Sequence, residues 1–311
     1  MQTTSPEQQQ RRKARLISSL TDGLPNLSSH VSELNKLLSS PSVDLKRVGK
    51  VIRNDPNLSA QVLRLCNSSL FNLRRRALDV EEAAILVGSE RLRTLVLTCS
   101  IMEFTYDRLP RGVVQTFWQH SFMSGMLSEG IARWIEYSGW ERAYLGGLIH
   151  DMGALPLLIV AKEENALTGE TKSGPWGGSL EAEKEYFGMT HCEAGSRIGQ
   201  CWNLFPSFID VFENHHHPER SVRDPLLVGI VAAADHFAEW RACDATKEGE
   251  PVESAEPESA DEDEFLKLCF PRLDAKARSE LTEMLETEYL HLLPVIEFNS
   301  SVEQPLAEKA V

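Results

Sequence analysis

Histidines and aspartates that could do chemistry gather in one stretch of the chain. Seven of the nine histidines fall between residues 120 and 236. Two aspartates accompany them, Asp151 directly after His150 and Asp235 directly before His236. Imidazole and carboxylate together are the ligands of borderline divalent metals such as iron, manganese, zinc or nickel, and they also serve acid-base chemistry near neutral pH. The sequence therefore predicts a functional site in this stretch.

The set that we predict to bind metal is His120, His150, Asp151, His191, His215, His216 and Asp235. Neighbouring side chains on a helix diverge by about 100°, so His150 and Asp151 need partners from other helices. One ion takes roughly four to six ligands, and seven therefore suit two ions bridged by Asp151. Two such ions lower the pKa of a bridging water and hold a phosphoryl oxygen, which is the chemistry of phosphohydrolases.

A structural role is the alternative for these side chains, because a single buried histidine is often satisfied by a backbone carbonyl. One convergent site explains all seven residues together, which favours metal binding. His217 and His236 fit the pattern less well, and we interpret them as supporting or surface groups.

Helical periodicity runs through almost every ordered stretch, and no strand pattern stands out, so we predict an all-α fold. Thr190 and Glu193 have the spacing of a capping box, which places His191 in the first turn of a helix. Pro206 and Pro225 are each positioned to begin a helix. The candidate ligands then come from five helices, an arrangement typical of a bundle core.

Composition changes along the chain predict six segments. The run from Lys247 to Glu264 carries nine acidic residues and one lysine, so this run accounts for most of the net charge of -14. The expected segments are a disordered N-terminus (1–19), an N-terminal helical half (20–110), a helical half with the ligands (111–245), an acidic disordered linker (246–264), C-terminal helices (265–296) and a tail (297–311).

Charge and cysteine usage narrow the classes of protein. The mildly acidic remainder lacks the basic surface that general nucleic-acid binding requires. The six cysteines are scattered, with no Cys-x-x-Cys pair, and we interpret them as buried thiols of a cytoplasmic protein. The apolar stretch 143–161 is interrupted by His150-Asp151, Gly153 and Pro156, so we expect a buried core helix and a break, with no membrane insertion.

An ordered series of motifs extends over about residues 20–240. The motifs are Leu24-Pro25-Asn26-Leu27, Val51 to Ser59, Leu63 to Ser68, Ala83 to Gly88, Arg91-Leu92-Arg93, Trp118-Gln119-His120-Ser121, Leu148 to Gly153, His191 to Gly195, His215-His216 with Pro218, and Ala234-Asp235. This series resembles the HDOD (HD-related output domain) family of bacterial signalling proteins. The resemblance implies an HD-domain-like helical bundle with an N-terminal helical subdomain. It also implies a regulatory module of signal transduction that acts through protein partners.

Related HD and HD-GYP phosphodiesterases use a metal set that maps onto the seven residues above. The chain departs from the HD-GYP pattern at two places. Ala154 stands where a lysine follows the motif's aspartate, and the Gly-Tyr-Pro signature is absent after the double histidine. The hypotheses are therefore a signalling module with a metal site, which works through a protein partner, or a metal-dependent phosphohydrolase that takes a nucleotide, cyclic dinucleotide or other phosphate ligand.

Overall fold

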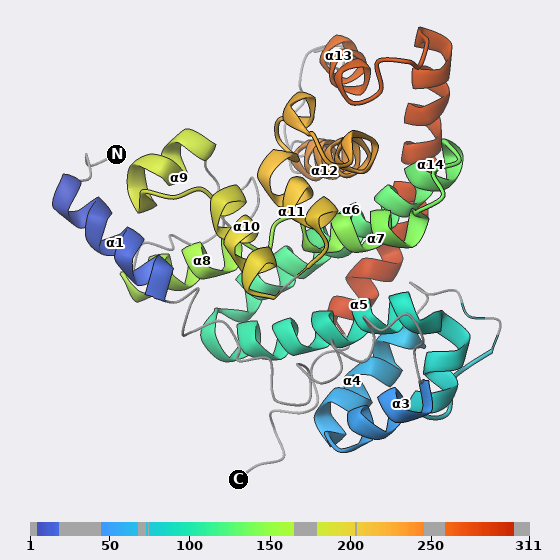
Figure 1. Ribbon diagram of the computed structural model, residues 1–311. Helices are drawn as coiled ribbons and strands as arrows, with labels where there is room; N and C mark the ends of the chain where they lie inside the picture. The colour runs from blue at the N-terminus through green and yellow to red at the C-terminus, as the bar shows by residue number, and fades with distance from the viewer. Residues whose placement is uncertain are drawn as a thin grey trace. The chain divides into compact units, whose positions relative to one another are not determined.

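The computed structural model describes residues 5–18, 45–67, 73, 75–164, 179–202, 204–245 and 259–301. Every regular element among these residues is a helix (Figure 1), which confirms the all-α class. The Leu24–Leu27 motif, residues 246–258 of the expected linker and residues 302–311 of the expected tail lie outside the described residues. The chain divides into two compact units, one formed by residues 1–21 and 115–293 and the other by 22–114 and 294–311.

Among its described residues, the unit formed by residues 22–114 and 294–311 contains three whole helices that pack on one another. They are α3 (Leu45–Arg53), α4 (Pro56–Cys66) and α5 (Val80–Arg108), and α5 packs against both others. Asp79 caps α5 by accepting a hydrogen bond from the backbone N–H of Glu82. Gly88, at φ 81°, breaks the helical conformation within α5, a backbone angle that favours glycine.

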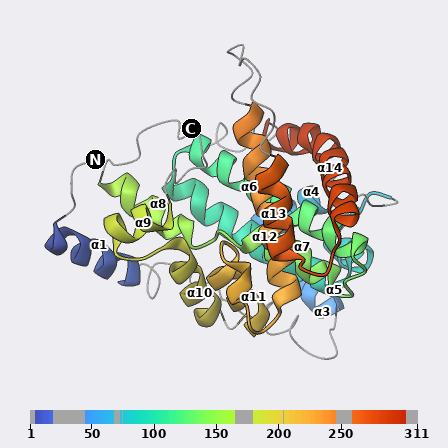
Figure 2. The same cartoon turned by 90° about the horizontal axis from the view of Figure 1, so that it is seen from above.

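The other unit holds the candidate ligands and most of the remaining helices. Its elements are α1 (Pro6–Ser18), α6 (Arg111–Trp134), α7 (Trp140–Ile149), α8 (Ala154–Glu163), α9 (Leu180–Phe187), α10 (His191–Cys201), α11 (Pro206–Asn214), the 3-10 turn η3 (Pro218–Arg220), α12 (Pro225–Ala245), α13 (Ser259–Cys269) and α14 (Ala275–Ser301). The boundary between the units falls inside α6 and inside α14. Helix α10 lies between α8 and α11, and α12 packs on α7, α11 and α13 (Figure 2).

Two glycines let backbone segments approach closely where the ligands converge. A side chain at Gly147 of α7 would overlap the carbonyl oxygen of Ser124 on α6. A side chain at Gly153, in the turn between α7 and α8, would overlap the carbonyl oxygen of His191 at the start of α10. These backbone contacts fix the spacing of α6, α7 and α10 around the site.

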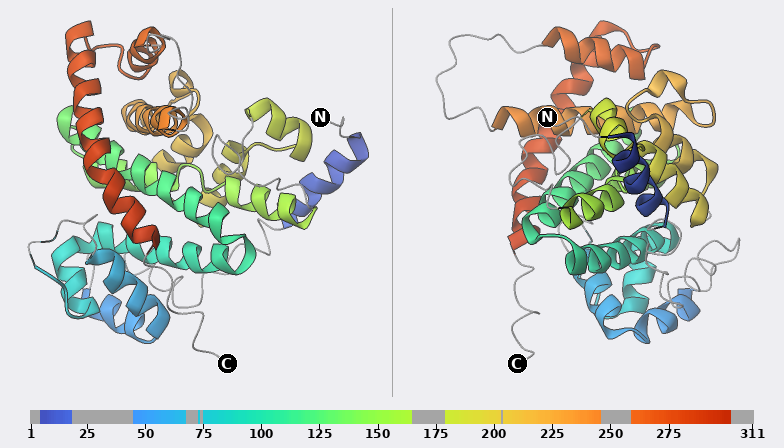
Figure 3. Two further views of the ribbon diagram at one scale, coloured as in Figure 1. Left: turned by 180° about the vertical axis from the view of Figure 1, so that it is seen from behind. Right: turned by 90° about the vertical axis from the view of Figure 1, so that its left-hand side faces the viewer.

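The N-terminus differs from the expectation of disorder over 1–19, because residues 6–18 form α1 beside α8 and α9 (Figure 3). Leu16 is fully buried. The Gln9 side-chain amide donates to the carbonyl oxygen of Lys184 at 2.8 Å, and Arg12 pairs with Glu164 at 2.6 Å. The local sequence is polar and does not by itself predict an ordered helix, so these long-range contacts stabilise α1.

The C-terminal helices extend beyond the predicted bounds at both ends. Helix α13 begins at Ser259, inside the expected linker, and α14 continues to Ser301, past the expected end at 296. Asp263, which the sequence assigns to the linker, pairs with Arg278 of α14 at 2.6 Å. A partner from another helix thus orders part of an acidic run that looks structureless by composition.

Within the described residues, one stretch is long and apolar enough to cross a membrane, Trp140–Glu163. Its most apolar window is 94% buried within the protein. The stretch consists of α7 and α8 separated by the turn at 150–153, as the sequence predicts.

Candidate metal centre

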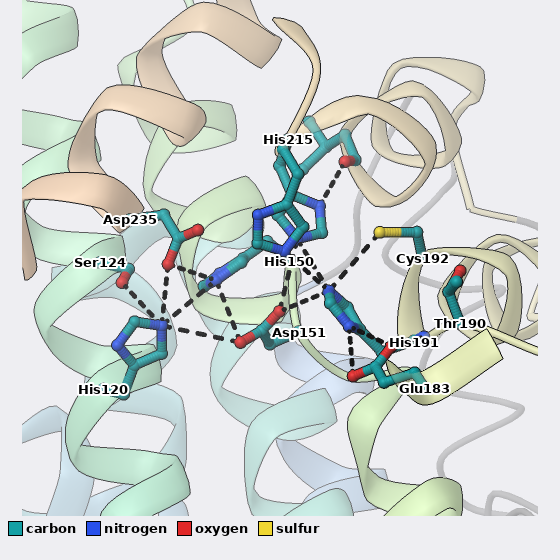
Figure 4. Close-up of polar contacts among 12 residues, drawn as sticks. His120, Ser124, His150, Asp151, Glu183, Thr190, His191, Cys192, His215 and Asp235 are labelled. Carbon is teal, nitrogen blue, oxygen red and sulfur yellow. Dashed lines mark hydrogen bonds and ion pairs between the residues drawn. The ribbon is translucent and has the colours of Figure 1, made fainter. Parts of the chain in front are cut away.

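The seven predicted ligands come together inside one unit, from the five helices that the sequence indicates. All of them except His216 are labelled in Figure 4. His120 lies on α6, His150 ends α7, His191 begins α10, His215 ends α11 and Asp235 lies on α12. Asp151 follows His150 in the turn before α8, and His216 follows His215. The grouping of all seven is thus a property of the fold.

Local capping explains why His191 stands at the beginning of α10. The Thr190 side chain accepts a hydrogen bond from the backbone N–H of Glu193, and the Glu193 carboxylate accepts one from the Thr190 N–H. This complete capping box confirms the prediction from sequence. It starts the helix at His191 and directs that side chain towards Asp151 (Figure 4).

Three of the histidines are oriented by acceptors outside the cluster. Nδ1 of His150 donates to the carbonyl oxygen of Gly147 at 2.6 Å, and Nδ1 of His215 donates to that of Val211 at 3.0 Å. Nδ1 of His191 donates to the buried carboxylate of Glu183 at 2.9 Å. Each Nδ1 therefore carries a proton, and each Nε2 is directed into the cluster, as in metal-bound histidines.

The spacing of the inward nitrogens fits the edges of a metal coordination shell. Nε2 of His191 lies 3.2 Å from Nε2 of His215 and 3.0 Å from that of His216, and the Nε2 atoms of His120 and His150 are 3.4 Å apart. Ligands about 2.1 Å from one ion are separated by about 3.0 to 3.4 Å at octahedral to tetrahedral angles. In the absence of metal, a proton on Nε2 of His191 can be shared with Nε2 of His215, and a cation between the two nitrogens would take the place of that proton.

The two oxygens of Asp151 face opposite sides of the cluster (Figure 4). Oδ1 lies 3.4 Å from Nε2 of both His191 and His215, and this buried atom accepts no hydrogen bond from the described residues. Oδ2 lies 3.5 Å from Nε2 of His150. A carboxylate placed in this way suits a bridge between two ions, and a cation would satisfy the unpartnered Oδ1.

Asp151 thus divides the cluster into two halves. We call His120, His150 and Asp235, with Asp151 Oδ2, the carboxylate half. His191, His215 and His216, with Asp151 Oδ1, form the imidazole half. In the carboxylate half, Oδ1 of Asp235 lies 3.0 Å from Nε2 of His120 and 3.1 Å from that of His150.

Electrostatics differ between the halves. Burial alone would raise the pKa of Asp151 and Asp235, but the nearby His150 outweighs it and both pKa values lie well below the ordinary range. Burial lowers the pKa of His150, yet Asp151 and Asp235 raise it well above its usual value. The carboxylate half therefore attracts positive charge, from a proton or from a cation that replaces it.

In the imidazole half, neighbouring carboxylates oppose the lowering of histidine pKa values by burial less strongly. Burial, followed by the neighbouring His215, lowers the pKa of His216 to about 3, and burial also lowers the pKa of His215. Both rings are thus neutral at pH 7, which is the form that binds metal. His191 differs: burial lowers its pKa, but Cys192 and Glu183 raise it well above the usual value.

Two residues that contact the cluster are not among the predicted ligands. Glu183 comes from α9, eight positions before His191, and this carboxylate is only 4% exposed. The Cys192 sulfur lies 3.5 Å from Nε2 of His191. The sequence shows that Cys192 directly follows a candidate ligand, but it does not show that the side chain points towards the cluster.

Four of the cysteines are buried as expected, Cys66, Cys99, Cys192 and Cys269, whereas Cys201 is exposed.

His217 and His236 lie outside the groups of converging donors, in line with the interpretation of the sequence. Nδ1 of His217 is 3.6 Å from Glu219, and the ring of His236 stacks on Phe265 with centroids 4.2 Å apart.

Asp210 supports the segment after the double histidine. Its Oδ2 accepts hydrogen bonds from the Ser221 hydroxyl and from the backbone N–H groups of residues 223 and 224.

A surface pocket of about 690 Å³ lies beside the imidazole half. Residues of α1, α9, α10, α11 and η3 line it, and Cys192 belongs to both the pocket wall and the donor cluster. None of the seven predicted ligands lines this pocket. Its charged residues are mixed in sign, with Lys184 paired to Glu193 at 2.5 Å.

Comparison with known structures supports the architecture. An HDOD domain protein of unknown function from Geobacter sulfurreducens superposes with a TM-score of 0.67 at 22% identity, covering 96% of this chain and 99% of that one. A protein from Shewanella amazonensis SB2B superposes with a TM-score of 0.58 at 19% identity, covering 91% and 99%. At these identities the likeness concerns the fold alone.

Sequence comparison places the chain in a family. An uncharacterized protein of Treponema pallidum (strain Nichols) is 26% identical over 230 residues, which are 70% of this chain and 43% of that protein. The chain therefore spans less than half the length of this relative. Residues 24–218 match the HDOD domain model, which is more than half of the 311 residues. The chain belongs to the HDOD domain family.

Proposed function

We propose that this protein is a regulatory module of signal transduction that acts through a protein partner and is held in its active shape by a two-ion centre. The observation that carries the proposal is the enclosure of the donors. His150 is fully buried, Asp151 and His191 are 3% exposed, and His120 at 14% is the most exposed ligand of the carboxylate half. Structural metal sites are closed by protein ligands, whereas catalytic sites keep an open position.

In this proposal the ions link five helices that otherwise bring buried carboxylates and imidazoles together at a cost in desolvation. His120, His150, Asp151 and Asp235 would hold one ion, and His191, His215, His216 and Asp151 the other. When bound, divalent ions polarise water and phosphoryl oxygens. Binding to the folded state alone stabilises it by about 2.7 kcal/mol per site at a hundredfold excess over Kd. Metal supply would then set the fraction of chains able to engage the partner.

The test combines elemental analysis with thermal unfolding and turnover assays of protein purified without chelators. We expect up to two equivalents of divalent metal per chain, and a lower Tm after chelation that metal restores. We also expect no turnover of nucleotides or phosphodiesters by the loaded protein. Metal-dependent hydrolysis that Asp151→Asn abolishes would overturn the regulatory role, and failure to bind any divalent ion would overturn the centre.

A metal-dependent phosphohydrolase is the second candidate, and the partial exposure of His120 favours it. The carboxylate half has four protein donors, so an ion with about six ligands keeps two positions for water or phosphate. The Shewanella relative compared above is provisionally named a metal-dependent phosphohydrolase. Ala154, which is fully buried, replaces the lysine of cyclic-dinucleotide phosphodiesterases, so a small nucleotide is the better substrate class for this candidate.

A further inference from the structure

Cys192 brings a sulfur donor to the imidazole half of the centre. Its Sγ lies within 4.8 Å of inward nitrogens of His191, His215 and His216, and these four donor atoms form one group. The side chain is buried, with the residue 7% exposed. The second residue of α10 therefore points its thiol into the same space as the three imidazoles (Figure 4).

The distances fit a shared ion. Sγ of Cys192 lies 3.5 Å from Nε2 of His191. Sulfur at about 2.3 Å and nitrogen at about 2.1 Å from a tetrahedral zinc are about 3.6 Å apart. An independent observation points to the same place, because the buried Oδ1 of Asp151 accepts no described hydrogen bond and lies 3.4 Å from Nε2 of His191 and of His215.

We propose that the Cys192 thiolate is a protein ligand of the imidazole half, which makes that half a zinc site with three histidines and one cysteine. The inference rests on the proposed metal centre and deepens it. Sulfur is a soft donor, and a set rich in nitrogen and sulfur selects zinc over magnesium, calcium or manganese. On binding, the thiol proton passes to solvent and the sulfur lone pair is donated to the ion.

A sulfur ligand also changes how many coordination positions the ion of the imidazole half keeps for water. With Oδ1 of Asp151, which lies 3.4 Å from Nε2 of His191 and of His215, these four donors give the ion five protein ligands, so it keeps no position for an exchangeable water. Cys192 forms part of the wall of the 690 Å³ pocket. The thiolate therefore stands between the pocket and the bound ion, and the imidazole half becomes a structural site with a sulfur edge towards the surface.

Cobalt substitution tests the ligand directly. Protein stripped with a chelator and reloaded with Co²⁺ should show a sulfur-to-cobalt charge-transfer band in the near ultraviolet. Cys192→Ser should lose the band, and its zinc affinity at this half should fall by at least the roughly tenfold to hundredfold that loss of a supporting residue costs. Cys201→Ser is the matched control, because Cys201 lies exposed on the same helix and should keep the band.

A second measurement needs no variant. Zinc should protect Cys192 of the wild-type protein from alkylation, mapped by mass spectrometry, while Cys201 reacts equally with and without zinc. Cobalt binding without the band, or a band that persists in Cys192→Ser, would overturn the sulfur ligand and leave the proposed centre standing. Absence of any cobalt or zinc binding would overturn the centre itself and the sulfur ligand with it.

Discussion

The carboxylate half and the imidazole half share Asp151 but are built from different chemistry. In the first, Asp235 lies within 3.1 Å of two histidines, and the mutual attraction raises the pKa of His150 well above its ordinary value. In the second, His215 and His216 have lowered pKa values, and Glu183 supports His191 from outside. The difference teaches that one half is organised by carboxylate charge, whereas the other presents two neutral imidazoles, His215 and His216, beside His191, whose pKa is raised.

Removing the shared residue should have the largest effect. In Asp151→Asn the bridging charge is lost, so we expect both ions to be lost from elemental analysis. The buried histidines also lose an ion partner, and breaking a buried pair costs about 3 to 5 kcal/mol of unfolding free energy. Glu219→Gln, at an exposed carboxylate 3.6 Å from His217, is the control and should keep both ions. Retention of two ions in Asp151→Asn would refute the bridge.

Variants that change only one half of the cluster test whether the two halves bind their ions independently. Asp235→Asn should lose the ion of the carboxylate half and keep the other, because Asp235 touches only His120 and His150 within the cluster. His216→Ala should do the reverse. Metal titration followed by calorimetry should therefore give one equivalent for each variant. Loss of both ions from either variant would mean that the two halves are one cooperative unit.

A smaller effect is expected from Glu183→Gln. The amide keeps an oxygen acceptor for Nδ1 of His191 but removes the charge, and loss of such support typically weakens metal binding tenfold to a hundredfold, about 1.4 to 2.7 kcal/mol. Competition with a chromophoric chelator measures this at the imidazole half. Glu181→Gln, in the first turn of the same helix, should leave metal affinity unchanged. Equal weakening of both halves would contradict the assignment of Glu183 to one of them.

The smallest effect on the centre is expected at Asp210, which contacts no candidate ligand by side chain. Burial raises its pKa, but hydrogen bonds from the backbone of Asp224, the Ser221 hydroxyl and others lower it overall. A depressed pKa contributes stability that is present above the unfolded value of about 3.9 and lost as pH falls through the folded value. Denaturant unfolding with chelator present should show Asp210→Asn about 1 kcal/mol less stable at pH 7.

The Asp210 difference should shrink as the pH is lowered below 4, because the wild-type carboxylate then gains a proton and loses its advantage over the amide. If the difference in unfolding free energy between variant and wild type grows under acid conditions, the lowered pKa of Asp210 is not the cause of its stabilising effect. Metal content at pH 7 should be the same in variant and wild type, which separates loop support from ligation.

Much of the centre could be predicted from sequence because histidine and aspartate are distinctive and helix signals are local. Thr190 with Glu193 specifies the start of α10, and the seven predicted ligands, which the fold brings together, were chosen by residue type and order. Glu183 and Cys192 could not be assigned, because their roles depend on how α9 and α10 lie against neighbours. Helix α1 was missed for the same reason: its order comes from Leu16 and Arg12 meeting distant partners.

The contact at Gly153 sets a limit on how the centre can change. It joins the turn after Asp151 to the carbonyl of His191 through backbone atoms alone. A side chain at residue 153 would push the turn that carries Asp151 away from the start of α10. The approach of Asp151 to His191 therefore depends on a residue that has no side chain and contributes no donor atom to the cluster itself.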